Sequence, residues 1–246
     1  REVTPMLHIG VLAHSADGAA LCFLEMIRQS ARVVGPHLHP EITLSILPMG
    51  DVLGAWERMD LQAINRHLMR TAERLKAAGC DFFVCPDNTA HIALDAATEP
   101  YPLPGLHIAD IVAKNATADG RRRLALLGTR WTMEGPAYPA ACARAGLEMR
   151  TPSREDRVRL DRIIFDELCQ GKLTAEARGE FVRVIDGLKT EGCDAVALSC
   201  TEIPLLIPPN DSPLPTLDST RLLAHEAVQV AQGKRPLPSW RGGSSK

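Results

Sequence analysis

Short apolar runs alternate with longer amphipathic stretches along this chain. Leu7–Leu12, Ile42–Leu47 and Phe82–Val84 have the length and composition of buried strands. A long amphipathic stretch over Leu61–Ala78 ends at Gly79, the residue that most often closes a helix. Strands that are apolar throughout and alternate with helices indicate a parallel sheet with right-handed crossovers.

The first predicted helix follows the loop Ala13–Ala16. Its apolar residues Leu21, Leu24 and Ile27 recur at helical spacing, and Asp17 stands where it can cap the helix.

The second half of the chain repeats this organisation. An apolar strand over Arg123–Thr129 corresponds to the first strand, and another is predicted over Ala195–Leu198. Further elements are expected as helices around 136–146, 154–170 and 174–191, a short strand over Leu214–Leu217 and a closing helix over Ser219–Gln232.

We therefore predict an α/β fold of two similar half-domains, Rossmann-like or flavodoxin-like, each with a parallel sheet. A pseudo-two-fold axis would relate the halves, with the active site in the cleft between them. Because the last helix is expected to pack back on the first half, the predicted domains are 1–113 plus 215–246 and 114–214.

One segment occurs twice, which supports the two-half interpretation. Gly79–Thr89 and Gly192–Glu202 each contain a Gly-Cys-Asp turn, a short apolar strand and a small polar loop, 113 residues apart. At equivalent positions the two loops carry Asp87 and Cys200. Ligands of open parallel sheets bind beyond the carboxyl ends of the strands. We expect these two side chains to face each other across one cleft.

The composition of the chain limits the classes of binding partner and the cellular compartment that we expect. The net charge is −2 and Arg121–Arg123 is the only short basic run, predicted on a solvated loop, so nucleic acid is excluded as the main partner. No apolar stretch approaches the roughly 20 residues of a membrane helix, and no signal peptide is visible. Seven cysteines without a C-x-x-C pair predict a cytoplasmic protein without a disulfide scaffold or metal site. The polar tail Ser239–Lys246 is expected to be disordered.

Four loops are predicted to meet at the carboxyl ends of the strands: Ala13–Ser15, Pro86–Thr89, Thr129–Thr132 and Ser199–Glu202. Helices begin directly after three of them, so backbone N–H groups would point into the site and suit a carboxylate. Neutral donors are added by Asn88, Thr89, Thr132 and Thr201.

Four motifs carry a resemblance to a known family: Asp-Asn-Thr-Ala-His (87–91), Leu-Gly-Thr-x-x-Thr-Met (127–133), Cys-Thr-Glu-Ile-Pro-Leu-Leu (200–206) and Leu-Asp-Ser-Thr-Arg-Leu-Leu-Ala (217–224). They resemble the cofactor-independent aspartate/glutamate/hydantoin racemase superfamily over nearly the whole chain. The resemblance implies that two cysteines on opposite sides of the substrate exchange its α-proton. No pyridoxal phosphate or metal takes part, and the charge that develops on the substrate carboxylate is stabilised instead.

The chain departs from the family pattern at one catalytic position. Cys200 stands where the second cysteine belongs, but Asp87 occupies the place of the first. A carboxyl group ordinarily has a pKa near 3.9 and a thiol near 8.5, so the two sides of the site differ. The resemblance implies racemase- or epimerase-like chemistry at the α-carbon of a small amino acid or related carboxylate.

Two alternatives stay open. One is a lyase, decarboxylase or isomerase of the same superfamily, similar to arylmalonate decarboxylases or maleate isomerases, using one cysteine plus Asp87. The rival class is a non-catalytic carboxylate-binding protein. Relatives are commonly dimers, which leaves a homodimer open, and the substrate itself is not identified.

The resemblance implies that Cys200 and Asp87 are catalytic. The substrate-binding residues would be His14, Ser15, Asn88, Thr89, Thr129, Thr132, Thr201 and Glu202.

Structural alternatives accompany these roles. Asp87 and Thr129 stand where they would cap helices, and Cys200 alone could be an inert buried thiol. Glu202 either orients a thiol or a substrate amine, or is a first-turn acid that favours the helix start. His91 is expected to satisfy local backbone groups. The remaining cysteines are interpreted as packing residues: Cys22, Cys80, Cys85, Cys142, Cys169 and Cys193. Trp131 and Tyr138 lie near the third loop, where they would shape specificity.

Overall fold

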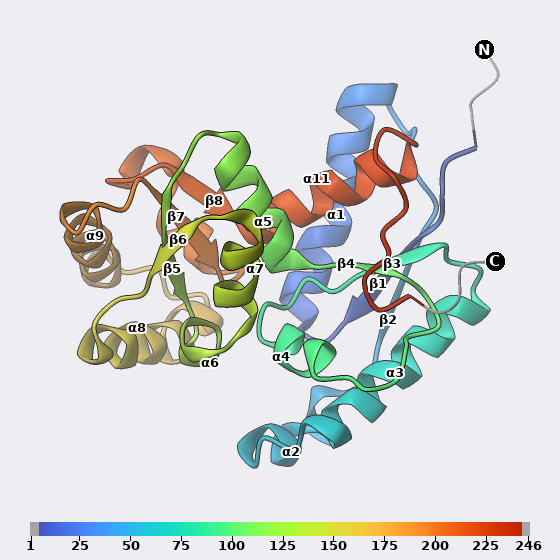
Figure 1. The fold of residues 1–246 in the computed structure, drawn as a ribbon, viewed down its shortest axis with the longest axis horizontal. Coiled ribbons are helices and arrows are strands. Elements are labelled where there is room, and N and C mark those ends of the chain that lie inside the picture. Colours follow the sequence, from blue (N-terminus) through green and yellow to red (C-terminus); the bar gives the residue numbers. More distant parts are fainter. Residues whose placement is uncertain (1–4, 243–246) are drawn as a thin grey trace. The chain divides into compact units, whose positions relative to one another are not determined.

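The structure, a computed structural model, describes residues 5–242 (Figure 1). The chain divides into two compact units. Unit 1 contains the residues up to Ile108 and those from Thr220 onward, and unit 2 contains Ala109–Ser219. Each unit holds a four-stranded parallel sheet with helices packed on it, which confirms the predicted α/β class. Within the described residues, no helix is both long and apolar enough to cross a membrane.

The sheet of unit 1 has the strand order β2-β1-β3-β4. Its strands are β1 (Ile9–Ala13), β2 (Ile42–Ile46), β3 (Phe82–Val84) and β4 (Gly105–Leu106). Its helices are α1 (Ala16–Val34), α2 (Leu53–Glu57), α3 (Leu61–Ala77), α4 (Ala90–Asp95) and α11 (Ser219–Ala231), with a 3₁₀ turn at Met49–Asp51.

Helices cover the central strands of unit 1. All residues of β1 and β3 are buried, and α1 and α3 both pack on β1 and β2. Gly10 allows α3 to approach closely, because a Cβ added there would lie 3.1 Å from Cδ1 of Leu75 and 3.3 Å from Cys80. Ile64 and Leu68 of α3 are fully buried at helical spacing.

The sheet of unit 2 has the order β6-β5-β7-β8, the same arrangement of strands as in unit 1. Its strands are β5 (Arg123–Gly128), β6 (Glu148–Arg150), β7 (Ala195–Ser199) and β8 (Thr216–Asp218). Its helices are α5 (Ile108–Ala118), α6 (Arg130–Glu134), α7 (Ala137–Ala145), α8 (Arg154–Asp166), α9 (Ala175–Thr190) and α10 (Ile203–Leu206), with 3₁₀ turns at Leu168–Gln170 and Pro209–Asp211.

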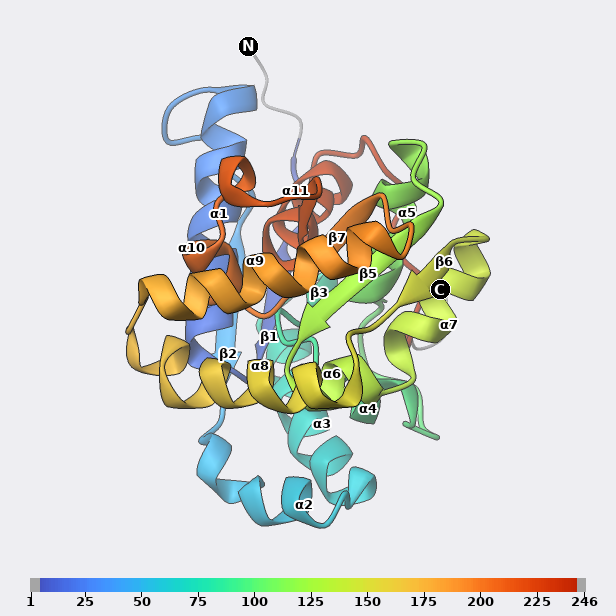
Figure 2. The ribbon, with the colours of Figure 1, turned by 90° about the vertical axis from the view of Figure 1, so that its left-hand side faces the viewer.

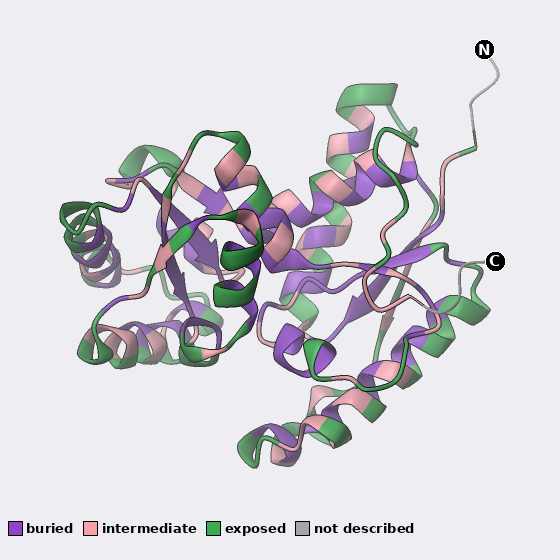
Figure 3. Cartoon of the chain, in the orientation of Figure 1, coloured by how far each residue is buried: buried purple, intermediate pink, exposed green. Residues whose placement is uncertain are grey.

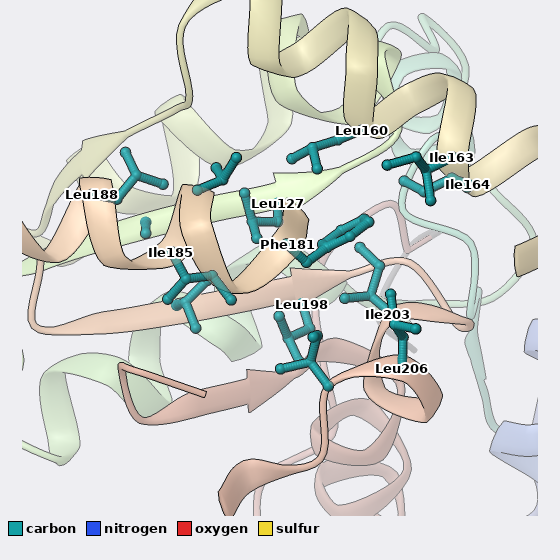
Figure 4. Close-up of a cluster of buried hydrophobic side chains, with 14 of the residues drawn as sticks. Leu127, Leu160, Ile163, Ile164, Phe181, Ile185, Leu188, Leu198, Ile203 and Leu206 are labelled. Carbon is teal, nitrogen blue, oxygen red and sulfur yellow. The ribbon is translucent and has the colours of Figure 1, made fainter. Parts of the chain in front are cut away.

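One core cluster of unit 2 lies between its sheet and the helices α8 and α9, which run across one face of it (Figure 2). Phe181 and Ile185 of α9 and Leu160 of α8 pack with Leu127 of β5 and Leu198 of β7 (Figure 4). The central strands β1, β3, β5 and β7 are largely buried, while the outer helix faces are exposed (Figure 3). Full burial of an aliphatic or aromatic side chain contributes about 1.5–3 kcal/mol.

Helix α1 differs from the prediction in its cap and its buried face. Ser15 caps the helix in place of Asp17, since its Oγ accepts a hydrogen bond from the Gly18 N–H at 3.4 Å. Leu24 is 44% exposed, whereas Met26 is fully buried, so the inward face is turned away from the predicted apolar stripe. The buried face consists of Gly18, Ala19, Cys22, Glu25, Met26 and Ser30, so it does not follow the predicted stripe of leucine and isoleucine.

The tail is the second correction. The described part of it, as far as Gly242, is bonded to unit 1: the Trp240 carbonyl accepts from the Gly105 N–H, and the Arg241 carbonyl accepts from the Tyr101 N–H, both at 2.8 Å. The indole of Trp240 also stacks on His91. The rest of the predicted disordered tail, residues 243–246, lies outside the described residues.

Two smaller predictions also fail in unit 2. The helix predicted over 154–170 ends at Asp166 and is followed by the 3₁₀ turn at Leu168–Gln170. Cys169, on that turn, is exposed and is therefore no packing residue.

Candidate active site

The register of the unit 2 sheet brings two predicted site residues together. Gly128 of β5 pairs with Ser199 of β7, so Thr129 and Cys200 leave the sheet side by side at its carboxyl edge. A Cβ added to Gly128 would lie 2.9 Å from the Ser199 carbonyl oxygen, closer than real Cβ atoms come to a neighbour. Because Gly128 has no side chain, the strand end that carries Ser199 can lie this close to β5, and the Cys200 loop starts from there.

The register of the unit 1 sheet produces the equivalent arrangement. Val11 of β1 pairs with Val84 of β3, and the loops that follow these two strands carry His14 and Asp87. Asp87 in unit 1 and Cys200 in unit 2 therefore follow the corresponding strands of two sheets with the same topology.

Cys200 carries its thiol beside a carboxylate. The residue is partly buried between β7 and α10, and its Sγ donates to Oε2 of Glu202 at 2.9 Å. Burial raises the pKa of the thiol well above its ordinary value, and the neighbouring negative charge of Glu202 raises it further. Glu202 thus contacts the thiol, as its thiol-orienting alternative requires, and Cys200 is a protonated thiol near neutral pH.

The strand end before Cys200 is anchored by a buried hydroxyl pair. The Ser199 O–H donates to the Tyr138 oxygen at 2.7 Å, and both residues are almost completely buried. Burial raises the pKa of the Tyr138 phenol far above its ordinary range, so it stays neutral. Tyr138 therefore supports the loop. Trp131, by contrast, is partly exposed and packs edge-on against Phe165.

The two threonines of the third loop bond to each other. Thr129 caps α6: its Oγ1 accepts from the Thr132 N–H at 3.4 Å, and its O–H donates to Oγ1 of Thr132 at 3.3 Å. Thr132 is buried, and Thr201 is half-buried next to Cys200. The helix-capping role of Thr129 is observed.

Asp87 serves the start of α4, as its structural alternative predicted. Its Oδ1 accepts from the Ala90 N–H at 3.0 Å. Asn88 is buried and Thr89 is half-buried in the same turn between β3 and α4. Cys85, two residues earlier, is fully buried, and burial raises the pKa of its thiol well above the ordinary value. Cys85 is therefore a packing residue and no substitute for a catalytic thiol.

His91 holds the backbone of the Asp87 turn. Its Nδ1–H donates to the Asp87 carbonyl at 2.8 Å, and its Nε2 accepts from the Ile108 N–H at 3.2 Å. Burial, followed by the neighbouring His107, lowers the pKa of His91 to about 3, so the ring is neutral near pH 7. The expectation that His91 satisfies backbone groups is confirmed.

His14 has a partner that the sequence did not indicate. Its ring is almost completely buried, and its Nε2 accepts a hydrogen bond from the indole N–H of Trp56 at 2.8 Å. Because the indole is only a donor, the proton of the neutral ring lies on Nδ1. Within residues 5–242, Nδ1 has no hydrogen-bond partner. Ser15, the neighbouring predicted binding residue, caps α1.

Among the residues that the structure describes, no group of three or more histidine, cysteine, aspartate or glutamate side chains could hold a metal ion.

Comparisons with known proteins identify the family of this chain. The Asp/Glu/Hydantoin racemase family matches residues 10–227. A glutamate racemase from Aquifex aeolicus is 26% identical over 147 residues, which is 59% of this chain. The aligned region spans little more than half of that enzyme, 55% of its length.

Solved structures show the same fold over nearly the whole chain. A Yersinia pestis protein named as a candidate Asp/Glu racemase is 31% identical, with a TM-score of 0.84, and the match covers 92% of this chain and 99% of that protein. An aspartate racemase homologue from Pyrococcus horikoshii is 26% identical, with a TM-score of 0.79 and the same coverage of both chains. This chain belongs to the Asp/Glu/Hydantoin racemase family.

Proposed function

We propose that this protein is a cofactor-independent isomerase that moves the α-proton of a small amino acid or a related carboxylate. Cys200 would act on one face of the α-carbon and Asp87 on the other. The observation that supports the proposal most is the hydrogen bond of the Cys200 thiol to Glu202, at a strand end equivalent to the one that carries Asp87. The names of the relatives, glutamate and aspartate racemases, favour an amino acid substrate.

Proton transfer in this site would balance as follows. The Asp87 carboxylate takes the α-proton, and the electron pair of the broken C–H bond delocalises into the substrate carboxylate. The Cys200 S–H then gives its proton to the opposite face of the α-carbon, which leaves a thiolate. The reverse reaction starts from the thiolate and a protonated Asp87. Because the Cys200 pKa is raised, the thiol is protonated at rest and the thiolate is a strong base once formed.

The substrate carboxylate needs donors because it carries the charge of the intermediate. We assign it to Asn88, Thr89, Thr129, Thr132 and Thr201, which follow β3, β5 and β7. His14 and Ser15 would contact another part of the substrate. A homodimer and a cytoplasmic location belong to the same proposal.

One observation favours a second candidate, a lyase, decarboxylase or isomerase that uses a single thiol. Cys85 is fully buried next to the Asp87 position, so unit 1 offers no accessible thiol there. A site with one thiol and one carboxylate suits chemistry in which only one face receives a proton. A non-catalytic carboxylate-binding protein is the outcome if no turnover is found.

The test is incubation with each enantiomer of aspartate, glutamate and other small amino acids. Chiral chromatography follows the opposite enantiomer, while released CO₂ or ammonia reports a lyase. We expect interconversion that Cys200→Ala reduces by about 10²–10⁴-fold. Cys169→Ala is the matched control, since it removes an exposed thiol of the same unit. Circular dichroism verifies that both variants are folded. Equal rates in Cys200→Ala and wild type would refute the proposal.

A further inference from the structure

A pocket of about 480 Å³ lies in unit 1 beside α2 and α3. Its polar lining consists of Arg58, Arg66, His67, Arg70 and Asp51. None of these residues is among those proposed for the α-proton chemistry, so the pocket has no role in the function described above.

The three arginines of this pocket are uncompensated. Arg66 and Arg70 lie one turn apart on α3, where like charges repel each other. Their guanidinium groups and that of Arg58 form no ion pair or hydrogen bond within residues 5–242. Asp51 is the only carboxylate in the lining, so three positive charges stand against one negative charge. Two exposed arginines of unit 2, Arg144 and Arg183, are by contrast paired with aspartates.

His67 supplies a second feature that points to a ligand. It is 95% buried (5% exposed), lines the pocket, and makes no hydrogen bond within the described residues. Burial lowers the pKa of its ring, and the neighbouring His14 and Arg70 also lower it, against the opposite effect of Asp51. The ring is therefore neutral near pH 7, with one N–H to donate.

We propose that this pocket binds a small dianion, either a phosphoryl group or a dicarboxylate. Two negative charges would balance the excess of guanidinium groups, which bind both oxyanions in a bidentate manner. The His67 N–H would donate to a third oxygen. The ring of His67 lies edge-on to His14 with centroids 6.1 Å apart, so the ligand would sit one side chain from the loop after β1.

Isothermal titration calorimetry of the full chain tests this proposal. Phosphate, pyrophosphate and succinate are titrated separately at constant ionic strength, which distinguishes phosphoryl from dicarboxylate ligands. We expect at least one to bind with one-to-one stoichiometry. Arg66→Gln and Arg70→Gln, both at exposed positions, should each weaken binding by about tenfold, the loss typical of one charge-assisted hydrogen bond. Arg154→Gln removes the same charge from an exposed position on α8 and should change nothing.

Comparison of the variants shows which results would overturn the anion-binding proposal. Absence of binding by all three anions, or equal weakening by Arg154→Gln and the pocket variants, overturns the proposal. Binding that Arg66→Gln and Arg70→Gln leave intact but Cys200→Ala abolishes would place the anion in the proposed active site instead. Because the pocket does not include Cys200, Cys200→Ala should bind the anion as the wild type does, whether or not the racemase proposal holds.

Discussion

Sγ of Cys200 and Oε2 of Glu202 lie 2.9 Å apart, and the thiol donates to the carboxylate. Thiolates are usually favoured in reactive cysteine sites by a neighbouring positive charge or a helix N-terminus. This pair does the opposite, because a partly buried carboxylate favours the protonated thiol. The Cys200 thiol therefore keeps its proton near neutral pH.

Replacing Glu202 by Gln should lower the pKa of the Cys200 thiol. The variant removes the negative charge that opposes ionisation and leaves burial as the main cause of the raised pKa. The pH profile of iodoacetamide alkylation, read at Cys200 by mass spectrometry, should shift to lower pH. Cys169→Ala is the suitable background, since the exposed Cys169 thiol would otherwise react as well. An unchanged profile would show that Glu202 does not control the thiol.

Replacing Asp87 by Cys should give a thiol on each side of the proposed site. If Asp87 limits one direction of racemisation, the variant should narrow the difference between the rates measured from the two enantiomers. The loss of the hydrogen bond from the Ala90 N–H should cost about 1 kcal/mol of stability. Asp87→Ala has the same loss without a thiol and serves as the control. Identical rate ratios in both variants would argue against a catalytic role for position 87.

Gly128→Ala should disturb the loop that carries Cys200. The added Cβ would lie 2.9 Å from the Ser199 carbonyl, which belongs to the backbone and cannot rotate away. We expect a loss of about 1–3 kcal/mol in the free energy of unfolding together with reduced turnover. Gly187→Ala is the matched control, because a Cβ there meets nothing within 4 Å. Equal stability of the two variants in urea denaturation would contradict the close approach.

Stability should fall at alkaline pH because several thiols are buried. Burial raises the pKa of Cys80, Cys142 and Cys193 from 9.0 to about 11. The unfolded chain releases these protons at lower pH than the folded chain. The contribution of the buried thiols to the free energy of unfolding is therefore complete below pH 9 and is lost as the pH rises towards 11. Each of these thiols lowers the free energy of unfolding by at most about 1.4 kcal/mol per pH unit in this range. Urea denaturation between pH 8 and 11 measures it.

Two variants test whether the buried thiols cause this pH dependence. Cys142→Ala should reduce the slope by the share of one thiol, whereas Cys169→Ala, which removes an exposed thiol, should leave it unchanged. A free energy of unfolding that stays constant from pH 8 to 11 would contradict the burial of these side chains.

The strands that organise the sheets could be predicted from the sequence because they are apolar on both faces. Phe82–Val84 was predicted with its observed bounds, and the ends of β1 and β5 within two residues. The edge strands β4 and β6 could not be predicted. β4 has only two residues, and β6 is Glu-Met-Arg, so neither carries an apolar run. They are strands because a neighbouring strand pairs with them.

Some residues of the candidate site could also be predicted from the sequence, and others could not. Asp87 and Cys200 could be found because a duplicated segment places them at equivalent strand ends. Trp56, which fixes the proton position of His14, lies on α2, 42 residues away from the loop of His14, and no sequence spacing connects the two residues. The polar composition of the tail predicts disorder, but in its described part the indole of Trp240 stacks on His91 and packs against Phe83.

The central claim is that Cys200 and Asp87 exchange protons at the same α-carbon, and hydrogen–deuterium exchange of the substrate in D₂O tests it most directly. Nuclear magnetic resonance would follow deuterium at the α-carbon for wild type, Cys200→Ala and Asp87→Asn. We predict deuterium incorporation with an intact carbon skeleton by the wild type, and a loss of about 10²-fold or more in each variant. Wild-type incorporation by Cys200→Ala would contradict the account.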